Sequence, residues 1–153
     1  MKKTGKVAIA ALIFGLFVVL PVAAQKTKSD FQKMYMDFLK KKGYSASIIE
    51  DGSIHFIIDK SGYFIIVNEK EPQMFLISTY LNMENRPKQA ALAAANNTNN
   101  KIYGTKVCIS DDGNFAFFAF GTLLLKPKDF QQIFDKVVAF VDEAVYFFIS
   151  EFQ

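Results

Sequence analysis

The chain has 153 residues, which is enough for one domain with a hydrophobic core of its own. Its single cysteine, Cys108, excludes a disulfide within the chain. The formal net charge is +3, but three of the lysines fall in residues 1–24, and without them basic and acidic side chains are equal in number. The sequence therefore gives no support for a nucleic-acid-binding protein, which needs a concentrated basic surface.

Residues 1–24 have the three parts of a secretory signal. A basic head is followed by an uncharged apolar run and then by small residues: Lys2, Lys3 and Lys6, Val7–Leu20, and Val22 with Ala24. This pattern predicts cleavage after Ala24 and export through the inner membrane of a bacterium, of Gram-negative type, to the periplasm or the medium. A retained single-span anchor is the alternative, which the short apolar run disfavours. Residues 25–153 are expected to form one domain.

A first helix is expected over residues 27–42. Thr27 and Asp30 resemble a capping pair, and Gly43 is placed to end the helix in a left-handed turn. The apolar residues of this segment recur at the spacing of one buried helical stripe: Phe31, Met34, Tyr35, Phe38 and Leu39.

Four strands are expected next, at residues 44–50, 54–58, 63–67 and 74–80. The turn sequences "DGS", "DKSG" and "NEKEP" separate them. Because these connections are short, consecutive strands should pair in antiparallel fashion.

A second helix is expected over residues 86–99, with Asn85 as its cap, Pro87 in its first turn and the segment "NNTNN" as its end. Strands at residues 103–110 and 115–121 then flank the turn "DDGN". Pro127 and Asp129 open the last helix, whose apolar arc is about twice as wide as a single buried stripe.

The order α-β-β-β-β-α-β-β-α indicates an α+β fold, with an antiparallel sheet of about five to six strands backed by helices. Three stretches share their turn placement with a known family: residues 38–77, the asparagine-rich "NNTNNKIYGTKVCISDDGNFAFFAF" at 96–120, and "KPKDF" at 126–130. On these stretches the chain resembles the YbjN-type family, often labelled bacterial sensory transduction regulators. The resemblance implies the fold of type III secretion chaperones and a dimer-prone, non-enzymatic module. Many members are cytoplasmic, and this chain departs from them by carrying a signal.

The sequence contains little that could carry chemistry. His55, the only histidine, falls on the polar side of its strand near Asp59, but a metal site usually needs three or four converging ligands. No glycine-rich phosphate loop or nucleophile motif occurs. We therefore expect no catalytic residues, no metal and no cofactor. An enzyme that uses His55 is the weaker alternative.

Aromatic residues are in excess, and they dominate the segment "NFAFFAF" at residues 114–120. Alternation places Phe115 and Phe117 on one face of that strand and Phe118 and Phe120 on the other. One small body should not leave so much apolar surface wet, so we expect a homodimer or a protein partner. The predicted interface residues are Phe118, Phe120, Phe140 and Phe147. A pocket for a lipid or another small apolar ligand is the alternative.

Overall fold

The computed structural model describes residues 27–68, 70–71 and 73–152, so the predicted signal at 1–24 lies outside the described residues. Six antiparallel strands form one sheet in the order β1-β2-β3-β4-β6-β5. The central pair, β4 and β6, is the longest. The bounds are β1 Ala46–Ile48, β2 Ile54–Ile58, β3 Ser61–Ile66, β4 Met74–Asn82, β5 Thr105–Ile109 and β6 Phe115–Leu123.

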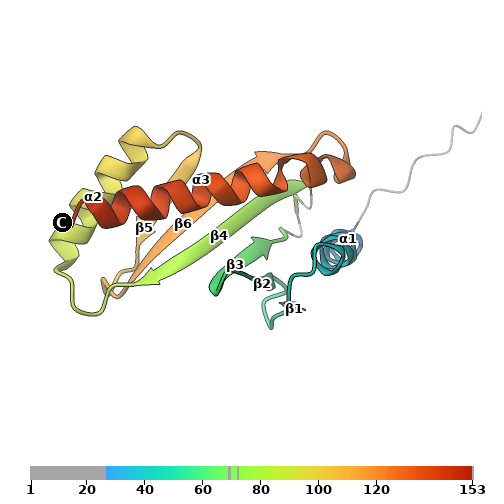
Figure 1. Ribbon diagram of the computed structural model, residues 1–153, viewed down its shortest axis with the longest axis horizontal. Coiled ribbons are helices and arrows are strands. Elements are labelled where there is room, and N and C mark those ends of the chain that lie inside the picture. Colours follow the sequence, from blue (N-terminus) through green and yellow to red (C-terminus); the bar gives the residue numbers. More distant parts are fainter. Residues whose placement is uncertain (1–26, 69, 72, 153) are drawn as a thin grey trace, which may run out of the picture.

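Three helices accompany the sheet: α1 (Lys28–Lys41), α2 (Lys88–Lys101) and α3 (Phe130–Ser150), with a 3-10 turn at Pro127–Asp129 before α3. The long helix α3 crosses the central strands, α1 lies over β1 and β2, and α2 packs beside β5 and α3 (Figure 1). The predicted α+β class, the element order and the six-stranded antiparallel sheet are confirmed. Within the described part of the chain, no helix is both long and apolar enough to cross a bilayer.

The ends of α1 form as its sequence predicts. The Thr27 hydroxyl oxygen accepts a hydrogen bond from the Asp30 backbone N–H at 3.3 Å, and the Asp30 carboxylate accepts from the Thr27 backbone N–H at 2.9 Å. These two bonds form a capping box, which satisfies backbone donors that have no partner within the helix. Gly43 follows the helix with φ +82°, a conformation that glycine adopts without strain.

The β2–β3 hairpin differs from its predicted turn. The strands close around only two loop residues, Asp59 and Lys60, which both have positive φ as a tight hairpin of this kind requires. Gly62 therefore lies in β3 and not in the turn. A Cβ at Gly62 would lie 3.1 Å from Nε2 of His55, so the glycine leaves room for that ring.

The second helix was predicted two residues too early at both ends. Pro87 is its N-cap residue, with no side-chain cap, so the predicted Asn85 cap is wrong. The asparagine-rich segment does not end the helix, because tertiary contacts hold it in helical form. The buried Thr98 hydroxyl donates to the Ala94 carbonyl at 2.8 Å. The Asn99 amide both donates to and accepts from the backbone of Val107, at 3.0 and 2.7 Å. Asn99 thus covers the outer edge of β5, which would otherwise be an unpaired strand edge.

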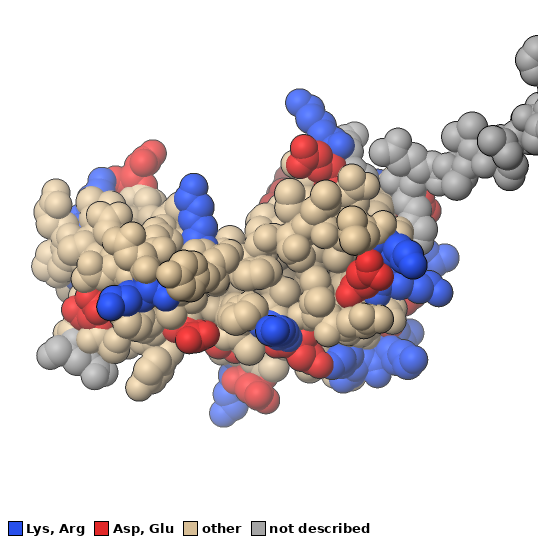
Figure 2. Space-filling model, turned by 90° about the horizontal axis from the view of Figure 1, so that it is seen from above, with Lys and Arg blue, Asp and Glu red and all other residues tan. Residues whose placement is uncertain are grey.

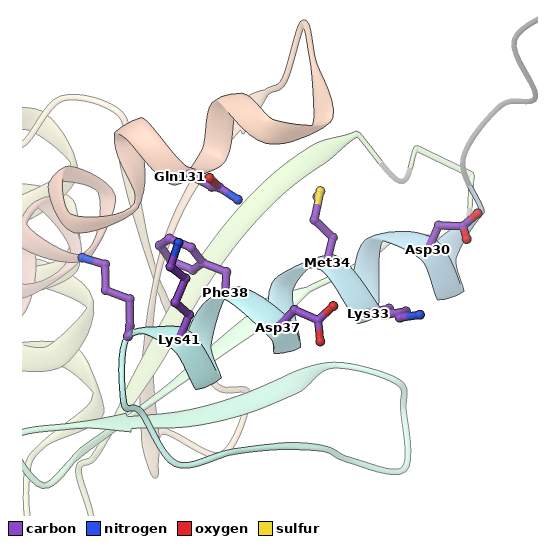
Figure 3. A pocket seen from close by; sticks show the side chains of 8 residues that line it. Asp30, Lys33, Met34, Asp37, Phe38, Lys41 and Gln131 are labelled. Atoms are coloured by element: carbon purple, nitrogen blue, oxygen red, sulfur yellow. The ribbon is translucent and has the colours of Figure 1, made fainter.

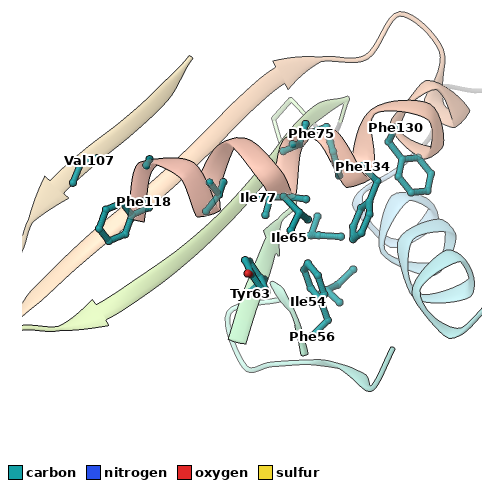
Figure 4. Close-up of a cluster of buried hydrophobic side chains, with 14 of the residues drawn as sticks. Ile54, Phe56, Tyr63, Ile65, Phe75, Ile77, Val107, Phe118, Phe130 and Phe134 are labelled. Atoms are coloured by element: carbon teal, nitrogen blue, oxygen red, sulfur yellow. The ribbon is translucent and has the colours of Figure 1, made fainter. Parts of the chain in front are cut away.

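The hydrophobic core lies between the helices and one face of the sheet (Figure 4). Phe134 of α3 is at its centre and is fully buried. Its ring centroid lies 5.0 Å from that of Phe38, 5.6 Å from that of Phe56 and 6.5 Å from that of Phe75. One ring of α3 therefore joins α1, β2 and β4, which explains why these elements pack as one unit.

Two tyrosine hydroxyls lie within this packed layer. Burial raises the pKa of Tyr35, whose hydroxyl has no hydrogen-bond partner among the described residues. Burial also raises the pKa of Tyr63, and its 2.5 Å hydrogen bond to the Asp142 carboxylate adds to that shift. Both side chains are therefore held in the neutral form by the fold.

We expect the free energy of unfolding to fall as the pH rises above about 10, the ordinary pKa of tyrosine. In that range the unfolded chain releases protons from Tyr35 and Tyr63 while the folded chain retains them. The stabilising contribution is therefore complete below pH 10 and is lost above it, at roughly 1.4 kcal/mol per pH unit for each tyrosine. Urea titrations of the wild type and of the Tyr35→Phe/Tyr63→Phe variant measure this slope. An equal slope in the two proteins would contradict the prediction. Tyr103→Phe, at a ring that is 91% exposed, is the control.

Candidate functional site

The sheet has a second face that no helix of the described chain covers and that only the β1–β2 loop reaches. The strand register shows which side chains lie there. One row of cross-strand partners points to the helices and consists of Ile54, Ile65, Ile77 and Phe120, from β2, β3, β4 and β6. Because side chains alternate along a strand, the next row points away from the helices. That row runs across His55, Phe64, Ser78, Ala119 and Lys106. We call this surface the open face. Its other members are Ile57, Ile66, Met74, Leu76, Tyr80, Phe115, Phe117, Gly121, Leu123 and Cys108.

Large apolar side chains of the open face are exposed to solvent. The exposed fraction is 52% for Tyr80, 45% for Phe117 and 54% for Leu123, with Ile57 and Ile66 close behind. Aromatic rings form a continuous strip across four strands. The His55 ring lies 5.0 Å from Phe64, Phe64 lies 6.0 Å from Tyr80, and Tyr80 lies 6.4 Å from Phe117, between centroids. An apolar strip of this size is typical of a contact surface.

The open face is almost free of charge. Among its strand residues Lys106, on the edge strand β5, is the only one that carries a permanent charge, and none is acidic. Long-range attraction to a highly charged partner therefore has no source on this face.

A hollow of about 290 Å³ lies within the open face. Phe64, Ile66, Tyr80 and Phe117 form its apolar lining, and Asp51 stands at its rim together with Ile49. The backbone N–H of Ser53 donates to the Asp51 carboxylate at 2.7 Å and lowers the pKa of Asp51, which is therefore ionised. The hollow can receive an apolar side chain or a small apolar molecule.

The predicted interface residues lie elsewhere. Phe118 is fully buried within one subunit, where it packs edge-on against Phe148 at 5.2 Å, so it exposes no surface to a second chain. Phe120 is half-buried and stacks on Phe140 at 5.3 Å, near the start of β5, and Phe147 is half-buried on α3. The structure therefore keeps Phe120 and Phe140 together but places neither of them on the open face.

On the sixth strand the predicted residues Phe118 and Phe120 lie on the side that faces the helices. Phe115 and Phe117 are its open-face aromatics, and the alternation had already separated them from Phe118 and Phe120. Which pair faces the helices depends on the side from which α3 crosses the sheet.

The residues considered for chemistry do not converge. The His55 ring packs against Phe64 at a tilt of 39°, and Asp59 lies in the adjacent hairpin turn. Within the described ranges, no three side chains of the His, Cys, Asp and Glu types gather closely enough to hold a metal ion. Cys108 is a free, exposed thiol on the open face.

No protein-family model and no curated protein matches this sequence. Solved structures do match its fold. YbjN from E. coli, described as a proposed transcription regulator, aligns with a TM-score of 0.56 and 14% identity over 74% of this chain and 87% of that one. A chain of the HopA1–SchA chaperone–effector complex aligns at 0.51 and 13%, over 78% and 97%. An uncharacterised protein from Methanothermobacter thermautotrophicus aligns at 0.52 and 12%, over 80% and 99%. The chain therefore has a YbjN-like and chaperone-like fold.

Proposed function

We propose that this protein is a non-enzymatic, chaperone-like module that binds other proteins and works as a homodimer through its open face. The observation that carries the proposal is the aromatic strip of Phe64, Tyr80 and Phe117 on a sheet face without a covering helix, with Tyr80 and Phe117 about half exposed. The fold it shares with a chaperone–effector complex supports a protein as the partner.

A second copy of the chain fits the open face better than a charged partner does. In a two-fold interface each surface meets itself, so it must not repel itself. A face whose strand residues include one lysine and no acid, with Asp51 at the rim of its hollow, meets this condition. Burying an exposed Phe or Leu side chain contributes up to about 1.5–3 kcal/mol, and less where half of the side chain is already covered. Several such side chains on each subunit can together offset the entropy lost on association.

Export is part of the proposal and rests on residues 1–24, whose basic head, apolar run and small residues match a secretory signal. An exported dimer would act in the bacterial envelope. There Cys108 has no partner within its own chain, so the dimer must be held by surface complementarity unless two copies of Cys108 meet.

The accessibility of Cys108 tests the homodimer. Cys108 is the only thiol and lies on the open face, so a second copy on that face should hide it. We expect the rate of alkylation in the residue 25–153 protein to fall at least about tenfold between sub-micromolar and high micromolar concentration. Sedimentation over the same range should show a monomer-to-dimer transition. A constant alkylation rate together with a monomer at the highest concentration would contradict the homodimer.

A small apolar ligand is a second candidate occupant, because the hollow beside Phe64 and Ile66 is lined by apolar side chains. Native mass spectrometry of protein purified from its host distinguishes the two. A monomer whose mass is raised by a bound small molecule supports the ligand. A dimer without any bound molecule supports self-association. The same spectra give the mass of the exported chain, which should begin at Gln25.

A further inference from the structure

A second groove lies away from the open face, between α1 and the first turn of α3 (Figure 3). Its volume is about 560 Å³, nearly twice that of the hollow on the open face. Apart from Gln131 and Lys42, its lining comes from one face of α1 over almost the whole length of that helix: Asp30, Lys33, Met34, Asp37, Phe38 and Lys41.

The floor of this groove is apolar and held in place. Phe38 packs edge-on against Phe130 and Phe134 of α3, at centroid distances of 4.8 and 5.0 Å. Met34, one turn away, points from α1 into the space in front of α3 (Figure 3). Both side chains are half-buried, so each retains apolar surface that a partner can cover.

One edge of the groove has alternating charges. Lys33, Asp37 and Lys41 follow each other at four-residue spacing along α1, so they stand about 6 Å apart in a line parallel to the helix axis. All three are exposed, and none of their side chains makes a hydrogen bond or an ion pair with another residue of the described chain. In contrast, Lys42 on the other side is paired with Asp135 at 2.6 Å. The lysines and acids at the α1 end are interspersed on the surface in Figure 2.

The backbone around the groove decides between a helical and an extended partner. Helices form both walls, and their N–H and C=O groups are used within the helices, so an extended segment would find no strand edge to pair with. An amphipathic helix satisfies its own backbone and needs only side-chain contacts. When two helices pack side by side, side chains at four-residue spacing on one helix lie opposite side chains at the same spacing on the other. Their flanking charges can then be complementary.

We infer that this groove docks an amphipathic helix of a partner protein. The helix would place apolar side chains on Met34 and Phe38 and an acid–base–acid series at four-residue spacing beside Lys33, Asp37 and Lys41. The inference rests on the proposed function, since it names the kind of protein segment that the module would bind. It does not require the open face, because α1 lies on the helix-covered side of the sheet.

Two synthetic peptides test the charge order. Each is an amphipathic helix of about five turns with leucines on one side, and the flanking series is Glu-Lys-Glu in the first and Lys-Glu-Lys in the second. Fluorescence anisotropy with labelled peptide should show that wild-type protein binds the first peptide at least about tenfold more tightly. The triple variant Lys33→Glu/Asp37→Lys/Lys41→Glu should reverse this preference. These side chains are exposed, and a thermal melt shows whether the variant folds.

The outcomes separate this inference from the homodimer. Equal binding of the two peptides, or a preference that the triple variant leaves unchanged, would overturn the groove assignment even if sedimentation shows a dimer. A preference that reverses in a protein that stays monomeric would overturn the homodimer and leave the groove assignment standing. Anisotropy and sedimentation on the same samples give both readings.

Discussion

Phe117→Asp should turn the proposed homodimer into a monomer and raise its dissociation constant by at least about 100-fold. Phe117 is at the end of the aromatic strip, on the long central strand β6, with 45% of its side chain exposed. In the proposed dimer an aspartate there would bury a carboxylate among apolar side chains, and Lys106 is the single cation among the strand residues of the open face. Two-fold symmetry places the change twice in one interface. A penalty of about 1.5 kcal/mol for each copy is thus enough for the 100-fold effect.

The matched control is Tyr146→Asp, which introduces the same charge at an aromatic ring of α3 that is 78% exposed and lies off the open face. It should leave the sedimentation profile unchanged. Tyr80→Asp, at the neighbouring position of the strip, should act like Phe117→Asp. Thermal melts of all three variants show whether each still folds. A Phe117→Asp protein that associates as strongly as the Tyr146→Asp protein would rule out the open face as the dimer surface.

Which residues of a strand share a face is easier to predict than which of its two faces is buried. Alternation along residues 115–120 separates Phe117 from Phe118 without a structure, and the structure shows this separation. Which of the two is buried depends on where α3 crosses the sheet, and that is a property of contacts between residues 118 and 148. The sequence around residue 118 does not predict such a long-range contact.

Helix ends that depend on neighbouring residues can be predicted from the sequence, and helix ends that depend on a distant contact cannot. The Thr27–Asp30 cap and the positive φ of Gly43 depend only on neighbouring residues, and both form as predicted. The end of α2 depends on Asn99, whose amide bonds the backbone of Val107 in β5. An asparagine-rich segment favours a loop by propensity, and here tertiary hydrogen bonds override that propensity.

The α1 groove could not be predicted from the sequence, because it too depends on contacts between distant segments. Met34 and Phe38 were assigned together to the buried stripe, which is correct in part because Phe38 contacts Phe130 and Phe134. The first turn of α3 stops short of covering them, and only the structure shows that limit (Figure 3). The unpaired series Lys33, Asp37 and Lys41 was visible in the sequence, but alternating charges on a helix usually indicate a solvated face.

Phe134→Ala should have the largest effect on stability, because Phe134 joins three separate parts of the fold. Its ring is fully buried and lies within 6.5 Å of the rings of Phe38, Phe56 and Phe75, from α1, β2 and β4. Removing it leaves a cavity that these rings, fixed by their own neighbours, can fill only in part. We expect the free energy of unfolding to fall by about 3–5 kcal/mol, a large fraction of the roughly 5–15 kcal/mol typical of a whole domain.

The control is Phe140→Ala, which makes the same change on the same helix. Phe140 is half-buried, and among the described residues its one aromatic ring contact is with Phe120, so water and nearby side chains can occupy the space it leaves. Its loss should lower the free energy of unfolding by about 1 kcal/mol. Urea denaturation followed by circular dichroism compares the two variants. Equal losses would mean that Phe134 does not connect α1 to the sheet, and the groove floor at Phe38 would then lack the support that the peptide experiment assumes.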